Sequence, residues 1–300
     1  MMRSAHSRAN ILFGGATGAS AFLIVAILAF ILFDVLSKGL GQLSWEFISA
    51  APRDGMTAGG IFPAIFGTVA LVLIMTAAVV PVGVLTAVYL YEYAKQEGLL
   101  ARFIRTAVYN LAGVPSIVFG LFGLGFFIQF VGGGIDSLFY GGQVVWGQPA
   151  IFWASLTLAV LTLPVVIVAT EEALRTVPRE HREAALALGC TKFETIWKVV
   201  LPQALPGILT GAILAVARGA GETAPILFTG AAYYLPHLPT KPYDQFMNLG
   251  YHVYVLATQS PDIEATKPIL YGTVLVLLLV TIALNLLATA LRTRLRVGRP

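Results

Sequence analysis

The sequence predicts an all-α membrane protein in which six transmembrane helices form one bundle. Of its 300 residues, 57% are hydrophobic and only 11% are charged, whereas a typical globular chain is about 45–50% apolar and about 25% charged. Six apolar runs are long enough to cross about 30 Å of hydrocarbon as helices, which takes roughly 20 residues. None of them shows the roughly ten-residue alternating segments of a membrane β-barrel. This composition excludes a cytoplasmic enzyme and a nucleic-acid-binding protein.

The first two predicted spans cover residues 11–33 and 60–91. The first apolar run exceeds the roughly 7–15 residues of a signal peptide, and Asp34 follows it in place of a small-residue cleavage site, so we predict an uncleaved helix. The second run is long for a single crossing and holds Pro63 and Pro81, which predicts a kink or an interfacial first turn.

The other four predicted spans cover residues 107–131, 149–170, 205–232 and 269–291. The third contains several glycines, which let helices approach closely, and Pro115 interrupts its hydrogen bonding beside Ser116. The fourth and sixth carry no charged residue, whereas the fifth contains Arg218 and Glu222. Because no repeat of about 20–50 residues and no low-complexity linker divides the chain, we predict a single membrane domain.

The basic residues predict how the bundle is oriented. Fourteen Lys and Arg residues lie in the amino terminus, the 92–106 and 171–204 loops and the carboxyl tail, whereas four lie in the loops on the other side. Basic loops tend to stay in the cytoplasm. We therefore predict a multi-pass protein of the cell inner (plasma) membrane with both termini cytoplasmic, three outer loops and two inner loops.

The 171–204 loop is the most distinctive segment outside the spans. Pro178 favours the first turn of a helix, the alanines and leucines of 184–188 are strong helix formers, and Gly189 favours a stop with positive φ. Apolar residues at helical spacing over 193–200 predict a second short helix. The pair is either an ordinary surface element or a docking element whose small side chains fit a groove of a partner protein.

Several residues of this loop resemble the EAA loop of ABC-importer permeases of the MetI-like type. They are Glu183-Ala184-Ala185, Gly189 and Leu201-Pro202, with Val199 standing where the family has isoleucine. In that family the loop is the coupling helix, which sits in a cleft of the ATPase subunit. The resemblance therefore implies that these residues couple the chain to a separate ATPase.

The same resemblance implies a domain organisation and an energy source. It places a permease core with the MetI-like fold over residues 63–291, after an amino-terminal helix and outer loop (1–62) and before a basic cytoplasmic tail (292–300). The chain has no Gly-x-x-x-x-Gly-Lys-Ser/Thr motif and so cannot cradle ATP phosphates itself. No cofactor is expected in this chain, because ATP and Mg²⁺ would be bound by the partner ATPase.

Two further segments are similar to the phosphate-importer permeases PstA and PstC. One is the run from Asn110 to Leu124, and the other is Arg218-Gly-Ala-Gly-Glu222-Thr223. The short first outer loop is more like the PstA type. This resemblance implies phosphate as the cargo and Arg218, Glu222, Thr223 and Ser116 as pathway residues. It also implies a second permease subunit (PstC type) or a second copy, an ATPase dimer (PstB type) and a periplasmic phosphate-binding protein (PstS type).

The residues themselves leave two interpretations of the Arg218–Glu222 pair open. An Arg at the centre of a membrane helix costs about 2.5–3.5 kcal/mol, so these groups should face the bundle interior or water. Separated by four residues on a helix, they share a face and can neutralise each other, which suits a structural ion pair. Alternatively, the planar guanidinium of Arg218 contacts an oxyanion and Glu222 tunes its release. Pro225 leaves the Gly221 carbonyl without its helical donor.

Other functions compete with phosphate import. The cargo could be another oxyanion such as sulfate or molybdate, or the chain could be a stand-alone secondary anion transporter, although the inverted repeats of such folds are not found. An intramembrane enzyme would need a catalytic constellation, and no zinc-protease or serine-hydrolase motif is present. The four histidines have no metal-ligand spacing, and we predict each as a solvated surface residue. They are His6, His181, His237 and His252.

Overall fold

The fold is a helical bundle, as predicted, with six helices long and apolar enough to cross a membrane in the part of the chain that the structure describes. The structure is a computed structural model that describes residues 2–95, 98–260 and 262–297. The six candidate spans are Phe13–Gln42, Phe62–Tyr93, Ser116–Phe139, Ile151–Thr176, Lys192–Gly221 and Ile263–Arg294.

Three helices form the centre of the bundle: α3 (Phe62–Val88), α7 (Ile151–Thr176) and α10 (Leu201–Gly221). Lipid is as apolar as the side chains, so these helices are held by close packing rather than by a hydrophobic driving force. Small residues make that packing possible. A Cβ on Gly83 of α3 would lie 2.6 Å from the Val166 side chain of α7, and a Cβ on Gly211 of α10 would lie 2.7 Å from Ala169.

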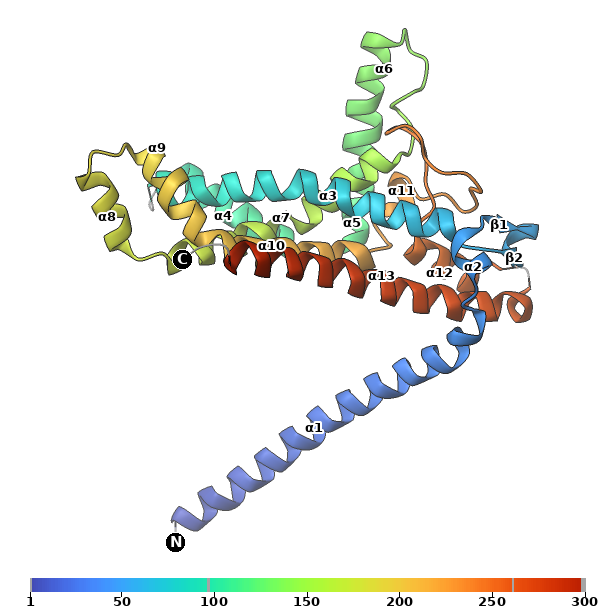
Figure 1. The fold of residues 1–300 in the computed structure, drawn as a ribbon, viewed down its shortest axis with the longest axis horizontal. Coiled ribbons are helices and arrows are strands. Elements are labelled where there is room, and N and C mark those ends of the chain that lie inside the picture. Colours follow the sequence, from blue (N-terminus) through green and yellow to red (C-terminus); the bar gives the residue numbers. More distant parts are fainter. Residues whose placement is uncertain (1, 96–97, 261, 298–300) are drawn as a thin grey trace.

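Two groups of shorter elements gather at opposite ends of this bundle (Figure 1). One end carries α8 (Arg179–Ala187), α9 (Lys192–Thr195) and the carboxyl end of α13 (Ile263–Val297). The other end carries the elements that connect the first two spans, together with α12. They are η1 (Leu40–Gln42), α2 (Trp45–Ser49), β1 (Pro52–Arg53), η2 (Asp54–Met56), β2 (Ala58–Gly59) and α12 (Leu249–Thr258). The strands are antiparallel, with Pro52 opposite Gly59. The segments predicted to lie on opposite sides of the membrane are thus separated in space.

Helix α1 (Met2–Gly39) extends away from the bundle, with no other described element beside most of its length (Figure 1). Only 6% of its most apolar 18-residue stretch is buried. Its contacts lie at its carboxyl end, where Lys38 donates a 3.3 Å hydrogen bond to the hydroxyl of Tyr271 on α13 and pairs with Asp34. The surface of most of α1 is therefore left for lipid or another chain to cover.

The predicted third span, 107–131, is wrong at both ends. The amphipathic helix α4 (Leu99–Ala112) ends before Pro115, and the apolar helix begins only at Ser116. Pro115 lacks the N–H that would continue the first helix, so the chain turns there. The second helix then runs further than predicted, as α5 (Ser116–Phe122), the π-helix η4 (Gly123–Gly132) and α6 (Gly133–Phe139).

The predicted fifth span, 205–232, is displaced toward the amino terminus. Its helix begins at Lys192, continues through the π-helix η5 (Ile196–Val200) and α10, and ends at Gly221. After a short non-helical stretch the separate helix α11 (Ile226–Thr229) follows. Pro225 therefore begins a new turn and does not kink a continuous helix, because the chain has already left helical geometry at Glu222, which has ψ of 130°.

The orientation of the bundle remains a prediction, which cysteine labelling tests. In a Cys190→Ser background, His237→Cys lies in an exposed part of the 233–248 loop and Leu188→Cys lies at the exposed tip of the opposite end. If the fourteen basic residues face the cytoplasm, an impermeant thiol reagent labels position 237 in intact cells and reaches position 188 only after permeabilisation. Labelling of position 188 alone in intact cells would reverse the topology.

Candidate functional site

The 171–204 segment contains one separate short helix, α8, which stops at the predicted glycine bend, whereas the predicted second short helix is part of the fifth span. Helix α8 ends with the N–H of Cys190 donating to the carbonyl of Ala185 at 3.1 Å. This 6→1 bond is typical of a helix stop in which the preceding residue is left-handed. Gly189 has φ of +87°, so the predicted positive φ is confirmed. The bend turns the chain sharply back toward the membrane.

The second half of the loop is built by a capping box. The Thr191 hydroxyl accepts a hydrogen bond from the Glu194 N–H at 3.2 Å, and the Glu194 carboxylate accepts one from the Thr191 N–H at 3.1 Å. These reciprocal bonds fix the first turn of α9. From there the helix continues without interruption through η5 into α10. The amphipathic segment predicted as a separate surface helix is thus the beginning of the fifth span.

The residues that resemble the EAA motif lie on and beside α8. Glu183 and Ala184 are exposed, whereas Ala185 is buried. Next to them Leu186 is 48% exposed and Leu188 is 87% exposed. Two exposed leucines beside a charged helix make an apolar tip at an end of the molecule that lies outside the spans. Such a tip is typical of a surface that another protein covers.

Leu201 and Pro202 lie further along, at the start of α10, and are half-buried. They line an apolar groove of about 390 Å³ between α3 and α10. Its other walls include Pro81 and Trp197. These two residues therefore shape the root of the loop and lie apart from the exposed tip.

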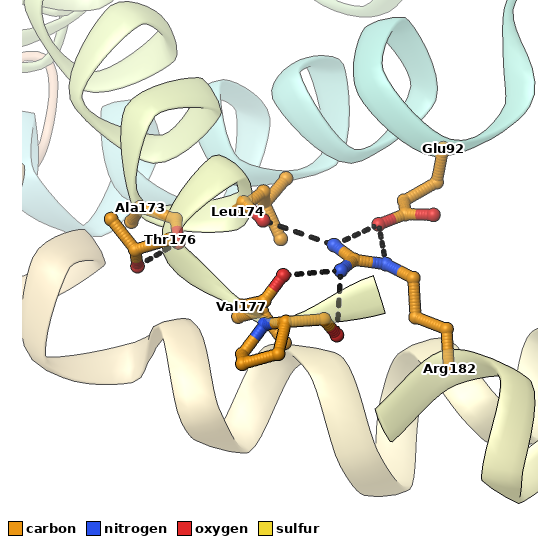
Figure 2. A network of polar contacts seen from close by, with 7 residues as sticks. Glu92, Ala173, Leu174, Thr176, Val177 and Arg182 are labelled. Atoms are coloured by element: carbon orange, nitrogen blue, oxygen red, sulfur yellow. Dashed lines mark hydrogen bonds and ion pairs between the residues drawn. The ribbon is translucent and has the colours of Figure 1, made fainter. Parts of the chain in front are cut away.

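A partly buried ion pair that the sequence did not predict holds α8 in place (Figure 2). Arg182 of α8 donates to one carboxylate oxygen of Glu92 through Nη2 (2.8 Å) and Nε (3.1 Å), and the two side chains are only 15% and 11% exposed. Glu92 belongs to the π-helix η3 (Tyr89–Tyr93), which ends the second span. Arg182 also donates to the carbonyls of Leu174 (2.9 Å) and Val177 (2.7 Å).

A second arginine binds the same two helix ends. Arg105 of α4 donates to the carbonyl of Leu90 at 3.1 Å and to the carboxylate of Glu171 at 3.4 Å. Glu171, in the last turns of α7, is 8% exposed. The ends of α3 and α7 are thus fastened by one arginine from α8 and one from α4.

The candidate pathway residues Arg218 and Glu222 form the ion pair that their spacing predicts. The Nε of Arg218 lies 3.4 Å from a carboxylate oxygen of Glu222, and the side chains are 41% and 19% exposed. Arg218 sits in the last turn of α10, where a cation is favoured by the free carbonyls and the helix dipole. The pair therefore lies outside the buried core, and part of the Arg218 guanidinium remains accessible for contact with another molecule.

The other two candidates lie around the helix break without joining the pair. A Cβ on Gly250, in the first turn of α12, would lie 2.6 Å from the Thr223 hydroxyl, so the start of α12 closes on Thr223. Ser116 is half-buried at the start of α5, and one turn later a Cβ on Gly120 would lie 3.0 Å from the Pro225 carbonyl. Among the described residues no hydrogen bond links Ser116 to Arg218 or Glu222.

The expectation that every histidine is a solvated surface residue is wrong for His252. This side chain is 2% exposed on the inner face of α12, and the Nδ1 atom has no hydrogen-bond partner. Burial lowers the pKa of His252 to about 4, so the imidazole is neutral near pH 7. It adds no positive charge to this end of the bundle. His181 and His237 are exposed, as predicted, and the side chain of His6 lies outside the described residues.

The described part of the chain is thus a bundle of six candidate membrane spans with an accessible charged pair at a helix break and an exposed short helix, α8, at one end. The chain belongs to the family of binding-protein-dependent transport system inner membrane components, whose model matches residues 79–297. Both the family and the relatives below place the chain among the permeases of ABC transporters.

Two curated relatives cover most of the chain. A probable ABC transporter permease of Bacillus subtilis, YqgI, is 35% identical over 292 residues, which are 93% of each chain. The phosphate transport system permease protein PstA 1 of Mycobacterium tuberculosis is 38% identical over 213 residues, which are 69% of this chain and 65% of the relative. The similarity to PstA-type permeases is thereby confirmed.

Solved structures confirm the fold class. A bacterial alginate ABC transporter, solved with an alginate-bound periplasmic protein, matches 96% of both chains with a TM-score of 0.69 and 14% sequence identity. The methionine ABC transporter MetNI in an inward-facing conformation matches 76% of this chain and 94% of its own with a TM-score of 0.53 and 20% identity. At such identities the likeness concerns the fold alone.

Proposed function

We propose that the chain is a permease subunit of an ATP-driven phosphate importer and forms half of its translocation pathway. The observation that carries the proposal is the accessible Arg218–Glu222 pair at the break after α10, in a chain that resembles a phosphate permease over more than two thirds of its length. A guanidinium offers planar, paired N–H donors that match phosphate oxygens. Thr223 and Ser116 lie on the segments that meet at this break and complete the proposed pathway.

The proposed energy source is a separate ATPase dimer of the PstB type, which docks on the loop end of the bundle. The exposed leucines at positions 186 and 188 supply an apolar contact, and Glu183 with Gly189 shapes the tip. ATP and Mg²⁺ are bound in that dimer, because this chain carries no phosphate-binding loop. A second permease subunit (PstC type, or another copy) completes the pathway. A PstS-type binding protein delivers phosphate at the opposite end.

Another oxyanion is the competing cargo. The name of the Bacillus subtilis relative specifies no substrate, although its similarity extends over more of the chain than that of the PstA relative. Sulfate and molybdate also present oxygens to a guanidinium, so Arg218 alone does not discriminate between them. A transport measurement with competing anions therefore has to distinguish phosphate from sulfate and molybdate.

Uptake by the reconstituted complex tests both the energy source and the cargo. Proteoliposomes that contain this chain with its partner permease and ATPase are expected to accumulate radiolabelled phosphate only when ATP, Mg²⁺ and the binding protein are present. An excess of unlabelled phosphate should abolish uptake, whereas sulfate and molybdate should leave it within twofold. Competition by sulfate or molybdate as strong as by phosphate would change the cargo. Uptake driven by an ion gradient without ATP would instead make the chain a secondary transporter.

A further inference from the structure

We propose that Glu92 and Arg182 are positioning residues that tie the coupling helix α8 to the carboxyl end of α3, so that a displacement of α8 moves α3 and α7 together. This inference rests on the proposed function as an ATP-driven permease. It assigns a role to two residues outside the motif that suggested the coupling loop. Figure 2 shows the tie from close by, with the guanidinium of Arg182 between the ends of two spans.

The covalent connection between α7 and α8 is short and non-helical. α7 ends at Thr176, and the chain reaches α8 through Val177 and Pro178 in extended conformations, with ψ near 122° and 142°. On its other side α8 packs against α9 and η5, the first turns of the fifth span, and the Nδ1 of His181 on α8 lies 2.6 Å from the Oε1 of Gln203 on α10. An extended step of this kind transmits a pull but bends under a push or a rotation. A contact with η3 joins α8 to the carboxyl end of α3 as well.

Arg182 provides that attachment in two directions at once. Its contacts with the Leu174 and Val177 carbonyls satisfy acceptors at the end of α7 that lack an intrahelical donor. Its contact with Glu92 reaches a residue 90 positions away in the sequence. The Arg182 guanidinium also lies 5.7 Å from the centre of the Tyr91 ring, on the same π-helical turn. One side chain therefore fixes α8 against both α3 and α7.

The low exposure of the pair makes it a strict constraint. With the side chains only 15% and 11% exposed, removing one member leaves the other charge with little water to compensate it, which is unfavourable. The pair thus remains closed while α8 moves, and the displacement passes into η3 and α3. Arg105 offers an internal comparison, because it fastens η3 to Glu171 of α7 with a buried carboxylate but makes none of its bonds to α8.

The first test measures phosphate transported per ATP hydrolysed in the reconstituted complex. Arg182→Met and Glu92→Gln are each expected to lower this ratio at least fivefold while the ATPase still copurifies. The double variant should be no worse than the worse single variant, since the two residues act through one contact. Arg182→Lys should retain part of the ratio, because an ammonium can still meet Glu92 but cannot span all the carbonyls. Arg175→Met is the matched control, because Arg175 pairs with Glu172 on exposed α7 surface.

Two outcomes of this test would overturn the inference. One is a normal ratio in Arg182→Met with only the amount of assembled complex reduced, which is what a purely structural pair predicts. The other is an equal loss in Arg105→Met, which would mean that any broken arginine tie at these helix ends has the same effect.

A second test needs no phosphate, so it separates this inference from the proposed cargo. Spin labels at Glu180→Cys on α8 and Leu85→Cys on α3, both exposed, report the distance between the two helices in a Cys190→Ser background. On addition of ATP and Mg²⁺ the distance distribution should stay narrow in the parent complex and broaden or shift in Arg182→Met. Identical distributions in both would show that the pair does not tie α8. A parent complex that moves no phosphate would contradict the proposed function and leave this readout intact.

Discussion

Exchanging the charges of Arg218 and Glu222 is expected to abolish phosphate uptake while the protein stays in the membrane and the complex assembles. The variant Arg218→Glu with Glu222→Arg keeps opposite charges at the two positions, whose side chains lie 3.4 Å apart in the parent, and keeps the net charge. If the pair serves only to join α10 to the chain after the break, the exchange should therefore be tolerated.

If the anion meets residue 218, the exchange places a carboxylate in its way. Two like unit charges about 4 Å apart repel by about 4 kcal/mol at an effective dielectric constant near 20. That energy corresponds to roughly a thousandfold penalty, since every 1.4 kcal/mol is about a factor of ten. Arg218→Ala should abolish uptake as well, because the guanidinium contact is lost. Glu222→Ala should bind the anion but turn over slowly, because an unpaired Arg218 holds it more tightly.

The measurement is radiolabelled phosphate uptake normalised to the amount of assembled complex. A matched control is the exchange of Glu264 and Lys267, an exposed ion pair at the start of α13, which should keep uptake near the parent level. Substantial uptake by the 218/222 exchange would return that pair to a structural role.

Replacing Gly189 by valine is expected to reduce uptake per chain in the membrane at least tenfold by displacing the tip of the coupling loop. A Cβ at Gly189 has no atom within 4 Å, so the substitution meets no steric obstacle from its neighbours. The obstacle is the backbone, because φ of +87° costs a branched residue about 1–3 kcal/mol. The cheapest relief is to unwind the end of α8, which breaks the bond from Cys190 to Ala185. Glu183 and the exposed leucines then lose their positions relative to the ATPase.

Copurification of the ATPase and uptake, both normalised to this chain in the membrane, measure the effect. Gly189→Asn is the matched control, because asparagine tolerates the left-handed region better than valine does, and it should retain most of the activity. Parent-level copurification and uptake in Gly189→Val would show that the bend does not matter for coupling. Equal losses in both variants would show that the left-handed backbone is not the reason.

The features that the sequence predicts correctly are those that depend on neighbouring residues. An apolar run of 20 or more residues identifies a span, so the six helices are found from composition alone. The Arg218–Glu222 contact follows from a spacing of four, and it survives although Glu222 has already left the helix. The left-handed bend at Gly189 follows from a glycine after strong helix formers.

The features that the sequence misses depend on contacts between distant segments or on where a helix stops. Nothing in the local pattern pairs Glu92 with Arg182, because 90 residues separate them. A signal was nevertheless present, since Glu92 directly follows an apolar run and a carboxylate at that place needs a partner or water. The burial of His252 arises because α12 packs against the bundle. The sequence of such a short helix between two spans does not show which of its faces is covered.

The isolation of α1 has a consequence for the synthesis of the protein in the cell. Its visible partners lie on α13, where a Cβ on Gly39 would come within 2.8 Å of the Tyr271 carbonyl. A ribosome adding about 5–20 residues per second needs roughly 10 to 45 s to make the chain between them. Throughout that interval α1 stands in lipid without its later neighbour. Thr17 and Ser20 donate to the carbonyls of their own helix at 2.7 and 2.9 Å, so neither hydroxyl is left unpaired in the bilayer. The first helix can therefore form completely in the bilayer early in synthesis and pack against α13 only after α13 has been made.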